Sequence, residues 1–290
     1  MRLAWKRWLA IVLAVAAVVL LWCFLGSKYA LEVTSYTLAA PKLTAPIRIV
    51  HLTDLHNSEF GAENARLVRL IEKQRPDLIF LTGDMLNGDE PRTDVSTRLV
   101  EQLAKIAPVY ASLGNHEKAH ENVFGSDVTA LYAKAGAHVL ERTYEDIEVN
   151  GQTVRIGGIY GYCLPEKYLR TREAREKEVE YLKAFEQTDL LTLLLCHVPT
   201  SWIVNDNLEE WNVDCIFSGH IHGGQIRLPW IGGAYAPDQG WLPGRLMGLY
   251  FSQDRERVMV LSRGLGSSDD VPRINNVPEI VVVDILPQMK

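Results

Sequence analysis

Five short apolar runs in this 290-residue chain are each followed at once by side chains of the kinds that bind metal ions. In chain order, the residues that follow these runs are Asp54 and His56, Asp84, Asn115 and His116, His197, and His220 and His222. Carboxylate, amide and imidazole groups together make a mixed oxygen and nitrogen site, which suits Mn, Fe or Zn better than Ca. This number of groups exceeds what one ion needs while it keeps positions open for water and substrate. We therefore expect two ions that share a carboxylate.

Each of these motifs has an ordinary explanation when it is taken alone. Gly-Asp and Gly-Asn after a strand are typical of turns, and a lone histidine is more often a structural residue than a ligand. His51, His120 and His138 occur without such a setting, and we assign them no role. The metal site is predicted by the joint occurrence of the five endings.

The segments between the apolar runs decide how the ligand residues can meet. Helical patterns cover residues 63–74, 94–106, 127–135 and the highly charged stretch 166–187, and short buried-type runs alternate with them. This alternation predicts an α/β fold with largely parallel strands. The carboxyl ends of parallel strands collect along one edge of a sheet, so we expect the five endings to form one site.

The tail of the chain has a different pattern. After residue 235 the sequence becomes rich in Gly and Pro, and two strand-like runs, VMVLSRG and EIVVVDIL, follow without a helix between them. We expect these two runs to form a closing antiparallel pair.

The N-terminus carries an uncharged run of 18 residues, 8–25, which as a helix is about 27 Å long and just spans a bilayer. Arg2, Lys6 and Arg7 precede the run, whereas only Lys28 follows it closely. The positive-inside rule then places the N-terminus in the cytoplasm and the rest of the chain outside. We favour an uncleaved signal anchor.

Two other interpretations of this run stay open. A cleaved signal peptide is one, although the run is long and no clear small-x-small site follows it. A lipoprotein signal at Cys23 is the other, although Trp22 occupies a position that such processing usually wants small.

Charge and cysteine content narrow the classes of function. Removing residues 1–30 takes away four of the 30 basic residues and none of the 36 acidic ones, which leaves a net charge of −10. This balance makes nucleic acid an unlikely partner. The cysteines at 23, 163, 196 and 215 show no CxxC spacing. We expect buried thiols at Cys196 and Cys215, with a bridge between neighbouring strands as the alternative outside the cytoplasm.

The ordered motifs resemble the signature of the calcineurin-like metallophosphoesterase superfamily. They are Asp54-x-His56, Gly83-Asp84, Gly114-Asn115-His116-Glu117, His197 and Gly219-His220-x-His222. The segments GHIHGGQIRLP and RGLGSSDDVPRINNVPEI further resemble the bacterial membrane-anchored YkuE-like phosphodiesterase branch. The resemblance implies an α/β fold of two facing mixed β-sheets flanked by helices, here preceded by one N-terminal transmembrane helix. We expect a cytoplasmic stub and signal anchor over 1–29, a connector and first strand over 30–46, and the metallophosphoesterase domain over 47–290.

The resemblance also implies a role for each motif residue. One divalent ion would be held by Asp54, His56 and His222, the other by Asn115, His197 and His220, and Asp84 would bridge both. His116 would face the substrate and assist at the leaving group or transition state, while metal-activated hydroxide attacks phosphorus. Many family members carry an acid three residues beyond the bridging Asp to orient this histidine, but here that position is Asn87. We expect Glu117, Asp89 or a backbone carbonyl to replace it.

These observations predict a membrane-anchored dimetal phosphoesterase, acting on phosphodiesters or small phosphate esters rather than on phosphoproteins. The predicted location is the bacterial cell membrane, with a single pass and an extracytoplasmic catalytic domain. One alternative is a hydrolase of lipid-linked or nucleotide-sugar pyrophosphates, because relatives in the superfamily use such substrates and the anchor places the domain beside lipid. A metal-binding surface protein without turnover is the lesser alternative.

Overall fold

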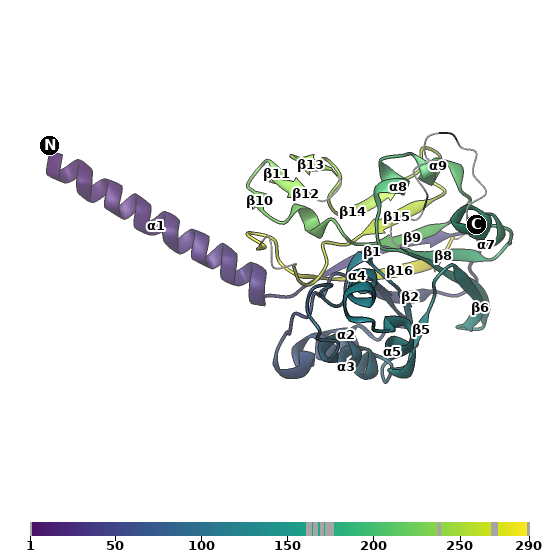
Figure 1. Cartoon of the computed structure of the whole chain (residues 1–290). Helices are drawn as coiled ribbons and strands as arrows, with labels where there is room; N and C mark the ends of the chain where they lie inside the picture. Colours follow the sequence, from purple (N-terminus) through teal and green to yellow (C-terminus); the bar gives the residue numbers. More distant parts are fainter. Residues whose placement is uncertain are drawn as a thin grey trace.

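The computed structural model describes residues 2–160, 164, 168, 171, 177–236, 239–267 and 272–288. Two mixed sheets of six strands face one another in it (Figure 1). The first sheet has the order β1 (Glu32–Ala40), β16 (Glu279–Pro287), β2 (Ile47–Leu52), β3 (Leu78–Thr82), β4 (Val109–Ser112) and β5 (Ala137–Val139). The second has the order β14 (Gly248–Phe251), β15 (Val258–Leu261), β9 (Cys215–Ser218), β8 (Leu191–Cys196), β7 (Gln152–Ile159) and β6 (Thr143–Val149).

Parallel pairing dominates both sheets. Strands β2 to β5 are parallel to one another, as are β7, β8, β9 and β15. Antiparallel pairing occurs where β16 meets β2 and at the two outer strands β6 and β14. The predicted α/β fold with two facing mixed sheets is confirmed.

The core between the sheets is built from aromatic and branched aliphatic side chains. Phe80 of β3 packs edge-on against Phe217 of β9, with 4.9 Å between ring centroids, and so joins the two sheets. Strands β3, β4, β8 and β9 are buried along their whole length, because helices cover the outer faces of the sheets. Continuous apolar runs are typical of such strands.

Helices flank both sheets, and their positions largely match the predicted ranges. The first sheet is covered by α2 (Ala65–Gln74), α3 (Asp94–Leu103) and α5 (Val128–Lys134). The second is covered by α7 (Lys177–Phe185) and α8 (Thr200–Ile203), followed by α9 (Asn207–Glu210). Most of the predicted helix over 166–187 lies outside the described residues, and α7 is its described part.

The chain also forms elements, most of them short, that the sequence pattern did not predict. They include η1 (Ala62–Asn64), α4 (Asn115–Phe124), η2 (His222–Gly224), β10 (Arg227–Leu228), β11 (Gly232–Gly233), β12 (Tyr235–Ala236) and β13 (Gly240–Trp241). Two of them, α4 and η2, begin at residues of the predicted metal site.

The predicted antiparallel pairing of the two tail strands is wrong. The first of them, β15, lies in the second sheet between β14 and β9, whereas β16 lies in the first sheet between β1 and β2. Both runs are almost continuously buried, so their apolar pattern shows that they are strands but carries no information about their partners.

The N-terminal helix α1 (Arg2–Tyr29) projects away from the sheets (Figure 1). Its segment Trp5–Tyr29 is long and apolar enough to cross a membrane, by length and composition, and its most apolar window is exposed throughout. The helix meets the rest of the protein at its last turns. Ser27 is buried there, and its hydroxyl oxygen accepts the backbone N–H of Asn276 at 2.8 Å.

Candidate metal centre

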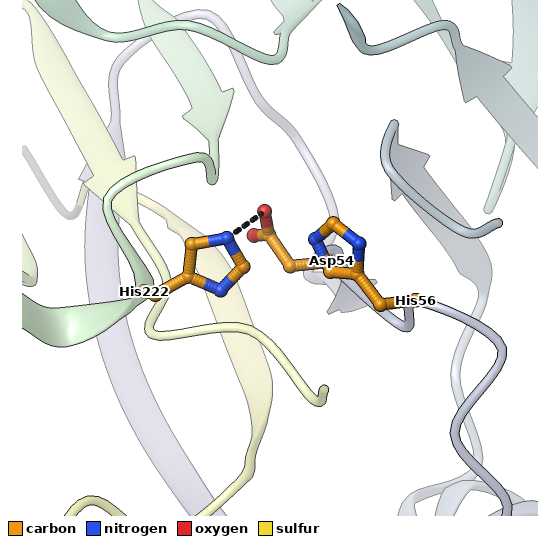
Figure 2. Close-up of side chains that lie close together, drawn as sticks. All are labelled: Asp54, His56 and His222. Carbon is orange, nitrogen blue, oxygen red and sulfur yellow. Dashed lines mark ion pairs between the residues drawn. The ribbon is translucent and has the colours of Figure 1, made fainter. Parts of the chain in front are cut away.

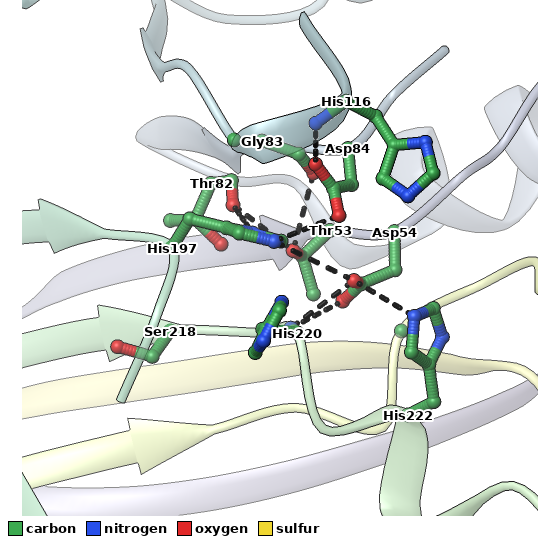
Figure 3. A network of polar contacts seen from close by, with 12 residues as sticks. Thr53, Asp54, Thr82, Gly83, Asp84, His116, His197, Ser218, His220 and His222 are labelled. Atoms are coloured by element: carbon green, nitrogen blue, oxygen red, sulfur yellow. Dashed lines mark hydrogen bonds and ion pairs between the residues drawn. The ribbon is translucent and has the colours of Figure 1, made fainter. Parts of the chain in front are cut away.

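The residues that follow five parallel strands meet in one buried region (Figure 3). Backbone hydrogen bonds hold the strand ends together: the N–H of Asp54 donates to the carbonyl of Gly83 at 3.0 Å, and that of Gly219 donates to His197 at 3.0 Å. The side chains form three overlapping clusters, with possible ligand atoms within 4.8 Å of one another in each. These clusters are Asp54, His56 and His222; His56, Asp84 and His116; and Asp84, His197 and His220.

The first cluster joins the end of β2 to the segment after β9 (Figure 2). Nε2 of His222 lies 3.5 Å from Oδ1 of Asp54, and the His56 and His222 rings are 5.1 Å apart. Burial lowers the pKa of His222 to about 3, although Asp54 opposes the shift. Nε2 of His56 is buried and has no hydrogen-bond partner among the described residues. It is free to act as a ligand atom.

The third cluster lies toward the second sheet (Figure 3). Nδ1 of His197 is 2.6 Å from the carbonyl oxygen of Thr82, which can only accept, so Nδ1 carries a proton and Nε2 points inward. Nε2 then lies 2.9 Å from Oδ2 of Asp84. Burial lowers the pKa of His197, but Asp84 and Asp54 outweigh burial and raise it to about 10. The His220 ring lies 5.2 Å from that of His197.

Asp84 is the carboxylate that belongs to two of the clusters. Its Oδ2 lies 2.9 Å from Nε2 of His197 and 3.9 Å from Nε2 of His56. Its other oxygen accepts the backbone N–H of His116 at 2.8 Å. Burial raises the pKa of Asp84, but the opposite effect of His197 and then His56 is larger. The pKa is therefore lowered overall, and the group is a carboxylate at neutral pH.

His116 is held by a backbone donor, which differs from our expectation for this residue. Its Nδ1 accepts the N–H of Gly88 at 3.1 Å, so the proton of the neutral ring sits on Nε2. The predicted orientation by Glu117, Asp89 or a carbonyl is therefore wrong. The Glu117 carboxylate accepts backbone N–H groups instead, at 2.7–2.8 Å, from Asp84, Met85 and Gly114.

Asn115 enters the site at the first residue of α4. Its Oδ1 is buried and has no hydrogen-bond partner among the described residues. The preceding Gly114 lies so close to Asp84 that a Cβ added there would be 2.6 Å from the Asp84 backbone nitrogen. Only glycine fits, because real Cβ atoms do not approach other atoms this closely.

The backbone at the site is strained. Five non-glycine residues of the clusters adopt positive φ: Asp54 at 54°, His56 at 47°, Asp84 at 53°, His220 at 70° and His222 at 50°. Such conformations are uncommon outside glycine, cost roughly 1–3 kcal/mol each, and gather at functional sites. The close packing of the two sheet edges maintains them.

These features fit a pair of divalent cations. The donor set combines carboxylate, amide and imidazole groups, all of kinds that bind Mn, Fe or Zn. Two of its atoms, Nε2 of His56 and Oδ1 of Asn115, are buried without a hydrogen-bond partner among the described residues. Because buried polar atoms are almost always satisfied, an ion is the natural partner for them.

A cavity of about 360 Å³ opens beside the clusters. Its lining includes His56 and Asn87, and also Phe24, Ser27 and Lys28 from the end of α1. Arg92 and Arg273 also line it. The space next to the metal centre therefore reaches the N-terminal helix.

Two residues that contact the clusters were not assigned from the sequence. Oδ1 of Asn87 lies 2.9 Å from Nδ1 of His56, and Nη2 of the buried Arg273 lies 3.3 Å from Nδ1 of His222. Neither position directly follows an apolar run, so the pattern that indicated the candidate ligands could not identify Asn87 or Arg273.

The three histidines without an assigned role lie outside the clusters. Their ring nitrogens contact other groups: His51 the hydroxyl of Thr82 at 2.7 Å, His120 that of Ser126 at 2.6 Å, and His138 the carboxylate of Glu145 at 3.1 Å.

Comparison with known proteins agrees with the geometry. The family model described as "Calcineurin-like phosphoesterase" matches residues 47–224. Phosphodiesterase YaeI of Escherichia coli is 29% identical over 257 residues, covering 83% of each chain. The uncharacterized metallophosphoesterase YkuE of Bacillus subtilis is 27% identical over 262 residues, covering 87% of this chain and 84% of its own.

A third relative carries a more specific name. UDP-2,3-diacylglucosamine pyrophosphatase LpxG of Chlamydia trachomatis is 24% identical over 323 residues, covering 93% of this chain and 94% of its own. The family match covers more than half of the chain and includes every residue of the three clusters. The chain belongs to the calcineurin-like phosphoesterase family and is a metal-dependent phosphoester hydrolase.

Proposed function

We propose that this protein is a membrane-anchored phosphodiesterase with two divalent ions, Mn, Fe or Zn, at its active site. The observation that carries the proposal is the position of Asp84, within 4 Å of His197 on one side and His56 on the other. A carboxylate between two sets of imidazoles is suited to bridging two ions. The name of the Escherichia coli relative supports a diester as the substrate.

The proposed ligand sets follow the first and third clusters, with Asn115 added to the set of the third. Asp54, His56 and His222 would hold one ion, Asn115, His197 and His220 would hold the other, and Asp84 would be shared. When bound, such ions would supply a nucleophilic water at neutral pH and neutralise phosphoryl charge. Nδ1 of His56 donates to the side-chain oxygen of Asn87, and Nδ1 of His197 donates to the carbonyl of Thr82. These hydrogen bonds support the assignment, because they leave each Nε2 facing inward.

His116 is the proposed catalytic residue. Its Nδ1 accepts from Gly88, so its Nε2–H is the group available to a substrate oxygen. In this position it can donate a hydrogen bond to a phosphoryl oxygen or to the departing alkoxide, which typically contributes about 10²–10⁴-fold to the rate.

We base the proposed attachment to the membrane on the properties of α1. Residues 1–29 then form the cytoplasmic stub and signal anchor, 30–46 the connector and first strand, and 47–290 the catalytic domain outside the cytoplasm. The helix is apolar over Trp5–Tyr29 and preceded by basic residues. A reporter fused after residue 290 should be active only on the external side, and a reporter active in the cytoplasm would contradict this orientation.

Hydrolysis of two chromogenic esters tests the activity. Full-length protein in detergent, stripped of metal and reloaded with Mn, Zn or Fe, is assayed with bis-p-nitrophenyl phosphate and with p-nitrophenyl phosphate. We expect faster turnover of the diester. Preference for the monoester would refute the phosphodiesterase assignment, and inactivity on both substrates with two ions bound would refute the proposed mechanism.

A second candidate is a hydrolase of lipid-linked or nucleotide-sugar pyrophosphates. It is favoured by the cavity, which extends from His56 to Phe24 and Lys28 of the N-terminal helix. A substrate that carries an acyl chain could keep that chain beside α1 while its phosphate lies at the metals. The name of the Chlamydia trachomatis relative supports such a substrate. Release of monophosphate from a lipid-linked pyrophosphate in mixed micelles, faster than from the chromogenic diester, would favour it.

A further inference from the structure

The two hairpins β10–β11 and β12–β13 expose a group of large apolar side chains. Leu228, Trp230, Ile231, Trp241 and Leu242 form this group, which we call the apolar loop patch. Trp230 is fully exposed, and Trp241 is 79% exposed. The domain otherwise buries its tryptophans, since Trp202 and Trp211 are 0% and 4% exposed. Two exposed tryptophans within one surface region indicate that something covers them.

The patch is one continuous part of the structure. Ala234 joins the two hairpins, because its N–H donates to Ile226 at 2.7 Å and its carbonyl accepts from Leu242 at 2.9 Å. The rings of Tyr235 and Trp241 pack 5.5 Å apart across the second hairpin. The exposed side chains therefore project from one unit, the two connected hairpins.

The two connected hairpins are linked to the end of α1 through Asn275. The side-chain amide of Asn275 donates to the carbonyl of Arg227 in β10 at 3.1 Å, and its oxygen lies 3.9 Å from Sγ of Cys23 in the helix. The next residue, Asn276, donates its backbone N–H to Ser27. In Figure 1, β10 to β13 lie on the side of the domain that faces α1.

These contacts indicate the level of the hairpins relative to the membrane surface. Cys23 belongs to the uncharged run of 8–25, so a surface that touches Cys23 lies where that run meets water. Tryptophan is enriched at this level of a membrane, because its ring is apolar and its N–H is polar. The charge also fits: residues 226–247 contain two arginines and one acid, whereas the chain after residue 30 has a net charge of −10.

We propose that the apolar loop patch inserts into the interfacial region of the same membrane that α1 crosses. The proposal rests on the membrane anchoring in the proposed function. Two attachments, the helix and the patch, fix the orientation of the domain relative to the bilayer. The cavity between the metal centre and α1 then lies at the lipid surface, and the ligand class for the patch is phospholipid rather than another protein.

Tryptophan quenching by brominated lipids tests the insertion in the full-length protein. The chain has seven tryptophans, three of them in α1. In a background with Trp5→Phe, Trp8→Phe and Trp22→Phe, the emission comes from the two buried residues and from Trp230 and Trp241. This protein is reconstituted in nanodiscs of phosphatidylcholine with ordinary or brominated acyl chains. The matched control adds Trp230→Phe and Trp241→Phe.

We expect the background protein to lose about half of its emission in brominated lipid and the control to lose almost none. Acrylamide in the water should quench the background protein only weakly. Strong quenching by acrylamide without quenching by brominated lipid would show that the patch faces water and would overturn the proposal. Protection from both quenchers would overturn it in favour of a second copy or another protein.

The anchor and the catalytic assignment are checked separately in the same samples. Failure of the protein to incorporate into nanodiscs would reject the anchor itself. Trp230→Phe and Trp241→Phe should leave hydrolysis of a water-soluble ester within about twofold of the unsubstituted protein, because the patch does not touch the clusters. An inactive protein with a quenched patch would contradict the proposed function and leave the insertion intact.

Discussion

Oδ1 of Asn87 lies 2.9 Å from Nδ1 of His56, whereas Nδ1 of the neighbouring His116 accepts from the backbone of Gly88. Asn87 thus orients His56, a proposed metal ligand, whereas the backbone of Gly88 holds His116, the proposed catalytic residue. An amide oxygen accepts without carrying charge, so it fixes the ring of His56 with Nε2 directed at the cluster.

We predict that Asn87→Ala lowers metal affinity by about 10–100-fold, because the ring of His56 loses the partner that orients it. Metal content after dialysis against graded chelator, measured by mass spectrometry, tests this. Asn87→Asp should restore most of the affinity, and Asn212→Ala, at an exposed loop position, should leave it unchanged. Equal metal retention in Asn87→Ala and the native protein would contradict the assigned role.

Asp84→Asn should abolish binding of both ions rather than one. The substitution removes the negative charge that lies between His197 and His56. Metal stoichiometry should fall from two per chain to near zero, whereas Asp94→Asn, at an exposed carboxylate of α3, should retain two. Loss of a single ion would show that Asp84 serves one site only.

His116→Ala should retain both metals and lose about 10²–10⁴-fold in kcat. The reason is that Nδ1 of His116 contacts Gly88, while its Nε2 side is the one available to a substrate. Metal content and diester hydrolysis are measured on the same sample, with His138→Ala as the control because His138 pairs with Glu145 on an exposed strand. If His116→Ala lost its metals, the proposed mechanism would be wrong.

Glu117→Gln should destabilise the fold. The carboxylate accepts N–H groups from Asp84, Met85 and Gly114, and an amide would turn a donor toward some of them. Leaving one buried donor unsatisfied costs about 1–3 kcal/mol, which lowers the Tm by roughly 2–12 °C in a domain of this size. Thermal unfolding in detergent measures the shift, and the exposed Glu148→Gln should move the Tm by much less.

Cys196 and Cys215 should stay reduced even in an oxidising compartment. The pairing register of β8 and β9 places Cys215 opposite Leu193, three residues before Cys196. That offset is about 10 Å along a strand, too far for a disulfide. Burial also raises the pKa of the Cys215 thiol, which keeps it unreactive. Peptide mapping without reductant should find no peptide that links the two.

The sequence predicted that the candidate ligands would lie close together, because each of them follows a strand. Parallel strands bring such endings to one edge, so the position of Asp54 or His197 in the chain already indicated its place in the fold. Helix lengths and the two-sheet arrangement were predicted for similar reasons, from periodicity and from a family resemblance.

Other features depend on contacts that no local pattern records. The partners of β15 and β16 are set by the whole sheet, and two buried runs look alike whichever strand they join. Arg273 reaches His222 from a loop 51 positions away, and Gly88 reaches His116 through its backbone, which has no side-chain signature. These contacts were visible only once the chain was folded.

The pairing of β1 with β16 has a consequence for the order in which the protein can be made. Strand β1 begins three residues after the last residue of α1, and β16 is its sole neighbour in the first sheet. Among the described strands, β1 is synthesised first and β16 last. The edge of the first sheet therefore cannot form until β16 has been made, and β1 needs protection as an open strand until then.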